Sequence, residues 1–358
     1  MSRVEATRRV GAADVVVTDD GAGQGRSALA AVRALAAAGY RPAVARSGRW
    51  SLAASSRACA RTFEVGPVED EGFAGAVGRA AREIGAYAVF PSSDAALLAL
   101  GAPVRHLLDK DRLVDIARSA GIPTPETRVF DTGEALIASA DRLPYPVVVK
   151  LPISRVPARK VSEPNDLAGA AAVEGPFLVQ PFVDSPVWAV GGVTWNGRLV
   201  AAVHQRYLRT WPLDCGTASA AVTVEPDQAV EERLLALLDG YDGIFQAQFT
   251  GEFLLDLNPR VYGSLPLAVA AGANLPALVC DLMRGEEVPS VRARAGVGYR
   301  WIEGDLRALK GLVRSKRLGL GGAMRALGPR RGSAHSVASL RDPRPLLARL
   351  RYTMRGRG

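Results

Sequence analysis

The chain has 358 residues, 48% of them hydrophobic and 23% charged, a composition typical of a globular protein with two or three domains or subdomains. The three cysteines, Cys59, Cys215 and Cys280, are widely spaced with no C-x-x-C pair, which argues against a disulfide framework or a structural zinc site. The net charge is +9, but no zinc finger, RNA-binding signature or aromatic-interleaved basic motif accompanies it, so nucleic acid is not an expected partner.

Residues 14–91 alternate strands with helices. Apolar runs predict the strands, and amphipathic or alanine-rich segments predict the helices at 26–38 and 72–84. Such alternation is typical of a parallel α/β layer, which we assign to a domain over residues 1–108. The first ten residues lead into a strand-length apolar run and not into the long apolar core of a signal peptide, so we expect a cytoplasmic protein.

The segment Pro91-Ser92-Ser93-Asp94 follows the last strand of this domain. Two roles are open for it. Ser93 or Asp94 is expected to cap the next helix, which is the favoured interpretation. The alternative is that the segment faces a substrate cleft.

The run Val147-Val148-Val149-Lys150 is apolar on both faces, which predicts a buried strand. A lysine at the end of a buried strand needs an anionic partner, because an isolated charge is expensive to remove from water. Lys150 is therefore a candidate for binding an anion.

Two apolar runs, 244–249 and 253–257, flank Thr250-Gly251-Glu252, which predicts a β-hairpin. A three-residue loop pairs Phe249 with Phe253 and sets Gln248 opposite Leu254 and Gln246 opposite Asp256. Four oxygen-bearing side chains then share one face: Gln246, Gln248, Asp256 and Asn258. Mg²⁺ takes a few protein oxygens and completes its shell with phosphate and water. The pattern favours a magnesium site, and the alternative is an ordinary half-exposed hairpin with polar residues outside.

Several blocks occur in order along the chain, and together they resemble the ATP-grasp superfamily. Asp256-Leu257-Asn258-Pro259-Arg260 resembles the E-x-N-P-R signature of that superfamily, with Asp in place of Glu. Gln248 resembles the metal-ligand position in the form found in carbamoyl-phosphate synthase large subunits. The other blocks are Asp109-Lys110, Gly121-Ile122-Pro123, the strand ending at Lys150, and the segment 177–183. The resemblance spans residues 15–283.

The resemblance implies a nucleotide site. Lys110 and Lys150 would contact the ATP phosphates. The hinge strand would read the adenine edge and line the ring through Gln180, Pro181, Phe182 and Val183, with Asp184 standing in for the usual ribose-binding Glu. The loop 151–160 lacks the glycines that relatives carry. Arg155, Arg159 and Lys160 either contact the phosphates there or belong to a solvated basic loop.

The resemblance also implies a metal and substrate site. Gln248, Asp256 and Asn258 would bind Mg²⁺, or Mn²⁺ in its place, and Arg260 would stabilise the charge that develops during the reaction. Arg206 and Arg209 either grip a phosphate or a substrate carboxylate or form surface ion pairs, and the sequence leaves both interpretations open.

The expected architecture is α/β, with α+β character in the ATP-grasp part. Residues 1–108 would form the parallel α/β domain, 109–184 the nucleotide-binding subdomain, 185–289 the metal and catalytic subdomain, and 290–358 a basic helical extension. The implied function is an ATP-dependent, ADP-forming carboxylate–amine ligase acting on small molecules through an acyl phosphate. The alternatives are other acyl-phosphate chemistry, like that of carbamoyl-phosphate synthase, and a non-catalytic nucleotide-binding protein that docks through its basic tail.

The segment 290–358 holds 17 basic and 3 acidic residues, whereas the rest holds 28 and 33. Ile302, Leu306, Leu309 and Val313 form an apolar stripe at helical spacing among basic residues. Packing of this stripe on the body is favoured, and the alternative is weak contact with an anionic membrane or an acidic partner. The uncharged stretch 261–280 predicts two short buried helices. A homo-oligomer is compatible with the sequence.

Overall fold

The computed structural model describes residues 14–21, 25–154, 156–328 and 333–354. Its N-terminal domain contains a parallel sheet in the order β3-β2-β1-β4. The strands are β1 (Val15–Asp19), β2 (Pro42–Arg46), β3 (Arg61–Glu64) and β4 (Ala88–Phe90), and the helices are α1 (Arg26–Ala37), α2 (Leu52–Ser55), α3 (Phe73–Ile84), α4 (Asp94–Ala99) and α5 (Arg105–Leu108). All five residues of β1 are buried, because helices cover both faces of this sheet. The predicted parallel α/β domain is confirmed.

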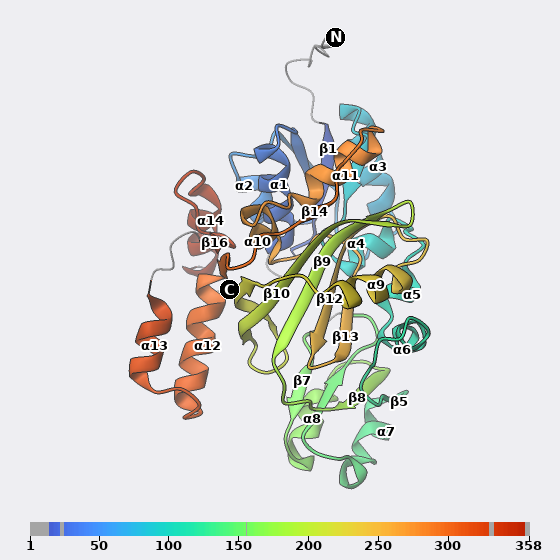
Figure 1. Cartoon of the computed structure of the whole chain (residues 1–358), viewed down its shortest axis with the longest axis vertical. Helices are drawn as coiled ribbons and strands as arrows, with labels where there is room; N and C mark the ends of the chain where they lie inside the picture. The colour runs from blue at the N-terminus through green and yellow to red at the C-terminus, as the bar shows by residue number, and fades with distance from the viewer. Residues whose placement is uncertain (1–13, 22–24, 155, 329–332, 355–358) are drawn as a thin grey trace.

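A small antiparallel sheet follows, in the order β5-β8-β6-β7. Its strands are β5 (Arg128–Phe130), β6 (Val147–Lys150), β7 (Arg159–Val161) and β8 (Phe177–Pro181). The helices around it are α6 (Lys110–Ser119), α7 (Gly133–Ile137), α8 (Leu167–Ala170) and the short 3₁₀ turns Ala140–Arg142 and Pro164–Asp166. In Figure 1 this sheet lies at the lower end of the molecule, away from the N-terminal domain.

The central sheet lies between the other two and runs in the order β13-β12-β9-β10-β11-β15-β16, with β14 pairing β10. Its long strands are β9 (Val187–Trp195), β10 (Arg198–Trp211), β11 (Thr217–Thr223), β12 (Gly243–Thr250) and β13 (Phe253–Asn258). One face packs on α5, α6 and α9 (Gln228–Leu237). The other face packs on α1, α10 (Leu265–Ala270) and α11 (Leu275–Met283). These last two helices are the short buried pair predicted for the uncharged stretch.

The C-terminal extension holds α12 (Ile302–Arg314), α13 (Leu320–Leu327) and α14 (Arg344–Met354), which lie along one side of the molecule (Figure 1). It also contributes three short strands to the central sheet: β14 (Val291–Arg292), β15 (Gly298–Arg300) and β16 (Ala334–His335). The extension is therefore built into the central sheet in addition to being helical. Among the described residues, the helices are too short or too polar to cross a lipid bilayer.

The apolar stripe of α12 is divided between the body and solvent. Leu309 is 3% exposed and packs inward, whereas Ile302 and Leu306 are 42% and 48% exposed. The buried side of the helix consists of Gly304, Asp305, Ala308 and Leu309. Packing of the stripe on the body therefore applies to only part of it, because the polar Asp305 takes a buried position.

Candidate active site

The β12–β13 hairpin has a register that differs from the predicted one. Thr250 pairs with Phe253, so the turn holds two residues, and Gln248 pairs with Asp256. The predicted pairing of Gln246 with Asp256 is wrong, because Leu255 is an extra, unpaired residue in β13, which is a β-bulge. The bulge restores the alternation that a two-residue turn would have broken. Gln246 pairs with Asn258, and the four predicted polar residues still share one face.

Lys150 and Lys110 both meet this hairpin. The backbone carbonyl of the bulged Leu255 accepts a hydrogen bond from Nζ of Lys150 at 3.0 Å. Nζ of Lys110, at the first turn of α6, lies 3.0 Å from Oδ1 of Asp256 and donates to the hydroxyl of Ser154 at 2.9 Å. The two lysines predicted to bind phosphates therefore contact neighbouring residues of β13, Lys110 the carboxylate of Asp256 and Lys150 the carbonyl of Leu255.

This cluster is electropositive and nearly buried, with Lys110 7% and Lys150 9% exposed. Burial is the main cause that lowers the pKa of Lys150 to about 7, and the positive charge of Lys110 adds to it, while Asp256 partly offsets both. One carboxylate does not satisfy two ammonium groups. The site therefore lacks negative charge, which a triphosphate supplies.

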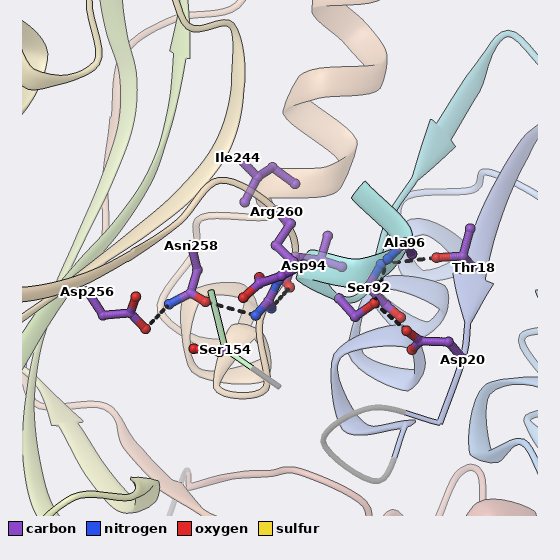
Figure 2. A network of polar contacts seen from close by, with 12 residues as sticks. Thr18, Asp20, Ser92, Asp94, Ala96, Ser154, Ile244, Asp256, Asn258 and Arg260 are labelled. Carbon is purple, nitrogen blue, oxygen red and sulfur yellow. Dashed lines mark hydrogen bonds and ion pairs between the residues drawn. The ribbon is translucent and has the colours of Figure 1, made fainter. Parts of the chain in front are cut away.

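Arg260 follows the hairpin and ties it to the N-terminal domain. Its Nη2 donates to Oδ1 of Asn258 at 2.8 Å, and its Nε donates to Oδ1 of Asp94 at 2.5 Å. Asn258 in turn donates through Nδ2 to Oδ2 of Asp256 at 3.3 Å. Figure 2 shows Arg260 between Asn258 and Asp94, with Asp256 beyond Asn258. A continuous polar chain therefore connects the end of β13 with the start of α4.

The residues of the predicted metal site form an oxygen-rich set with a single carboxylate. Gln248 lies opposite Asp256 across the hairpin, and Asn258 is bonded to Asp256. Gln246 is committed elsewhere, because its amide donates to the hydroxyl of Ser264 at 3.1 Å. No cluster of three His, Cys, Asp or Glu side chains suited to a metal occurs in the described part of the chain. The set fits Mg²⁺, a hard ion held through one or two carboxylates together with phosphate oxygens.

The predicted adenine hinge is a buried strand end. The Gln180 side chain, on β8, is buried and donates to the hydroxyl of Thr127 at 2.8 Å. Phe182 donates its backbone N–H to the carbonyl of Pro146, and its ring lies 3.7 Å from Nζ of Lys160. Pro181 and Val183 are half-buried beside it, whereas Asp184 is exposed.

The other described basic residues predicted for the site are paired with residues other than Lys110, Lys150 and Asp256, or are exposed. Arg209 forms two hydrogen bonds to the buried Asp305 of α12, at 2.6 and 3.0 Å, and Arg206 is exposed. Lys160 lies 3.4 Å from Asp214, and Arg159 is exposed. Arg155 lies outside the described residues.

The segment at the end of β4 has its expected capping role, and a position facing a substrate cleft stays a prediction. Ser93 caps α4 by accepting the N–H of Ala96, as predicted, and also donates to Asp20 at the end of β1. Asp94 instead holds Arg260. Figure 2 shows Asp94 beside Arg260, next to Asn258 at the end of the hairpin.

Sequence reasoning missed three members of this site: Ser154, the Leu255 carbonyl and the role of Asp94. Asp94 lies 166 positions before Arg260, and nothing local in the sequence connects them. The Leu255 carbonyl belongs to the unpaired residue of the bulge, whose position the predicted register did not include. A signal for Asp94 was present, because a carboxylate ends a parallel strand at the sheet edge where ligands of α/β proteins bind.

The arrangement of the three sheets is that of an ATP-grasp fold, as the resemblance predicted. Residues 174–305 match the family described as ATP-grasp in the biosynthetic pathway with Ter operon. No protein of curated function matches the sequence significantly.

Solved structures share this fold at low sequence identity. The carboxyaminoimidazole ribonucleotide synthase from Aspergillus clavatus, complexed with ATP, has a TM-score of 0.62 and 16% identity, with 79% of this chain and 80% of that chain covered. The N5-carboxyaminoimidazole ribonucleotide synthetase from Thermus thermophilus gives 0.59 and 17%, with 78% and 81% covered. The L-amino acid ligase from Bacillus licheniformis gives 0.57 and 14%, with 76% and 74% covered.

Proposed function

We propose that this protein is an ATP-dependent, ADP-forming ligase that joins a carboxylic acid to an amine through an acyl phosphate. The observation that carries the proposal is the continuous chain of contacts from Lys110 through Asp256 and Asn258 to Arg260. It brings two groups suited to phosphates, one carboxylate and one guanidinium to the end of a single hairpin. The similar structures of an L-amino acid ligase and an N5-carboxyaminoimidazole ribonucleotide synthetase support the same class of reaction.

A carboxylate has no good leaving group for an amine to displace, and phosphorylation by ATP supplies one. A carboxylate oxygen of the acid attacks the γ-phosphorus of ATP, and the bond from that phosphorus to the β-bridging oxygen breaks, releasing ADP. The amine nitrogen then attacks the acyl carbon, and the carbon–oxygen bond to phosphate breaks. The nitrogen loses a proton to solvent or phosphate. The sum is acid, amine and ATP giving amide, ADP and phosphate, with no covalent enzyme intermediate.

The residues divide this work by charge. Lys110 and Lys150 hold the phosphate chain, because both are nearly buried and only Lys110 is ion-paired with Asp256, whereas Lys150 donates to the backbone carbonyl of Leu255. Asp256, Asn258 and Gln248 would hold Mg²⁺, which when bound neutralises charge on the β- and γ-phosphates. The guanidinium of Arg260 contacts Asn258, next to the proposed metal ligands. It stabilises negative charge on the transferring phosphoryl group and then on the tetrahedral oxygen.

The test is ADP release from Mg-ATP over a panel of carboxylic acids with hydroxylamine as the amine, which converts an acyl phosphate into a hydroxamate. We expect ADP and hydroxamate in equal amounts and a loss of at least about 100-fold in Asn258→Ala. The matched control is Asn165→Ala, an exposed amide in the small-sheet region. ADP release that needs no acid, or that survives in Asn258→Ala, contradicts the proposal.

A further inference from the structure

A cavity of about 430 Å³ lies between the N-terminal domain and the central sheet. β4, α4 and α5 line it on one side, and β12, α11 and the Pro259-Arg260-Val261 turn line it on the other. Its size falls within the range of small-molecule sites, roughly 300–1,000 Å³. None of the nucleotide or metal residues assigned above lines it except Arg260.

The wall of this cavity is mainly apolar. Phe90, Leu97, Val104, Leu107, Ile244 and Val279 all contribute to it. A ligand with many hydroxyl or charged groups would leave those groups without hydrogen-bond partners against this wall, and burying an unpaired polar group is unfavourable. The cavity therefore suits an aliphatic or aromatic body.

Arg260 is the charged group at the reaction end of the cavity. Figure 2 shows Ile244, which lines the cavity with it, next to Arg260. The guanidinium has five N–H groups, and the described residues accept from three of its nitrogens: Asp94 from Nε, Val261 from Nη1 and Asn258 from Nη2. One N–H on each terminal nitrogen then has no acceptor among the described residues and can donate to a carboxylate.

Two exposed acidic residues, Asp239 and Asp242, also line the cavity. Their negative charge disfavours a second carboxylate on the ligand. Arg260 is the only arginine or lysine among the described residues that line the cavity, so it is the group that an acid's single carboxylate would bind.

We propose that this cavity binds the acid substrate, and that the acid carries an aliphatic or aromatic body, as in apolar amino acids and arylalkanoic acids. The inference rests on the proposed ligase function, because it places the acid's carboxylate at Arg260. Arg260 donates to Asn258, which in turn donates to the proposed metal ligand Asp256. The cavity then determines which acid is activated, while Lys110 and Lys150 bind ATP.

The test uses the full chain and two acids that differ only in size, 3-phenylpropanoate and propanoate, with Mg-ATP and hydroxylamine. Ala102 lines the cavity and is half-buried, so Ala102→Phe fills space there without replacing a core residue. We expect this variant to raise KM for 3-phenylpropanoate at least about 10-fold, with propanoate changed by less than about 2-fold. The Kd of Mg-ATP stays unchanged. Ala229→Phe, at an exposed position of α9, is the matched control.

A binding readout separates this inference from the ligase proposal. Trp195 lines the cavity, so 3-phenylpropanoate should alter tryptophan fluorescence in the wild type and not in Trp195→Phe. Hydroxamate from charged or polar acids only, or equal KM values in Ala102→Phe and the wild type, overturns the cavity assignment and leaves the ligase standing. If no acid gives hydroxamate, the ligase proposal fails, and the fluorescence change alone decides whether the cavity binds apolar acids.

Discussion

Nζ of Lys110 lies 3.0 Å from Oδ1 of Asp256, so a side chain assigned to the nucleotide touches one assigned to the metal. In the nucleotide-free protein each neutralises the other. Lys110→Met should raise the Kd of Mg-ATP about 10- to 100-fold, the range for losing a charge-assisted hydrogen bond. Isothermal titration calorimetry measures it, with Lys310→Met, an exposed lysine of α12, as the control. Equal affinity in Lys110→Met and the wild type would remove Lys110 from the site.

Lys150 makes nucleotide binding depend on pH. Its pKa is lowered to about 7 by burial, so the free protein holds this lysine mostly neutral at pH 8. A triphosphate favours the charged form, and binding at pH 8 should therefore take up about one proton per nucleotide. Calorimetry in two buffers of different ionisation enthalpy counts that proton. Lys150→Met should bind more weakly and without uptake, and equal uptake in both proteins would contradict the assignment.

The lowered pKa of Lys150 also makes the stability of the folded protein depend on pH. The unfolded chain keeps this lysine protonated up to its ordinary pKa of 10.5, whereas the folded protein releases the proton above about 7. Between these values the unfolded state binds more protons, so stability rises with pH. The destabilisation that comes from burying Lys150 is complete below about pH 7 and disappears as the pH approaches 10.5. Urea unfolding without nucleotide measures the difference between Lys150→Met and the wild type. A difference that does not vary between pH 6.5 and pH 9.5 would contradict the lowered pKa.

Arg260 is expected to act on the rate and not on ATP affinity. Arg260→Lys keeps a positive charge but cannot contact Asp94 and Asn258 together with a substrate carboxylate. We expect kcat to fall about 100- to 1,000-fold, with the Kd of Mg-ATP changed by less than about 3-fold. Arg325→Lys, at an exposed position of α13, is the control. A variant that loses ATP binding in proportion to kcat would show a structural role only.

Asp256, Asn258 and Gln248 should bind a metal ion only weakly when no nucleotide is present. Asp256 is its one carboxylate, and that carboxylate is already paired with Lys110 and hydrogen-bonded by Asn258. Electron paramagnetic resonance with Mn²⁺ should therefore show a Kd weaker than about 1 mM for the protein alone. Addition of a non-hydrolysable ATP analogue should tighten binding at least about 10-fold, because phosphate oxygens complete the shell. Tight Mn²⁺ binding to the nucleotide-free protein would contradict this arrangement.

Asp342 connects the C-terminal extension to the N-terminal domain. It accepts from Nε of Arg33 at 2.9 Å, from the Ser56 hydroxyl at 2.6 Å and from the Arg57 N–H at 3.0 Å. Burial raises the pKa of Asp342, but these hydrogen bonds outweigh it, so the pKa lies below its usual value. Asp342 thus stabilises the fold above its unfolded pKa, and this contribution is lost as pH falls through the folded pKa.

Asp342→Ala should lower the free energy of unfolding by about 3 kcal/mol at pH 7, because it leaves a partly buried Arg33 unpaired. Urea denaturation measures it. Glu286→Ala removes an exposed pair with Arg284 and should change stability by less than about 0.5 kcal/mol. Equal stability of the two variants would show that the extension is not held through Asp342.

The sequence was sufficient for the parts of the fold that depend on local pattern. The parallel N-terminal sheet follows from alternating apolar runs, and the turn at Asn196-Gly197 adopts the positive φ angles that its residues favour. The polar face of the β12–β13 hairpin follows from side-chain alternation. Its register did not, because the bulge at Leu255 depends on the lysine and sheet packed against it.

Long-range pairings account for the rest. Asp94 and Arg260 meet because the N-terminal domain packs on the end of β13, and Asp305 is buried because Arg209 and Arg300 reach it from the central sheet. Residue type alone predicts that such groups need partners but not which partners they find. The strands of the C-terminal extension are only two or three residues long, too short for a recognisable pattern.

The most direct test of the acyl-phosphate route is to measure isotope transfer from the acid to phosphate. An apolar acid labelled with ¹⁸O in its carboxylate is turned over with Mg-ATP and an amine, and the released phosphate is analysed by ³¹P NMR. The acyl-phosphate route predicts one ¹⁸O in each phosphate, because in that route a carboxylate oxygen attacks the γ-phosphorus and leaves with it. Unlabelled phosphate formed together with the amide would contradict the acyl-phosphate route.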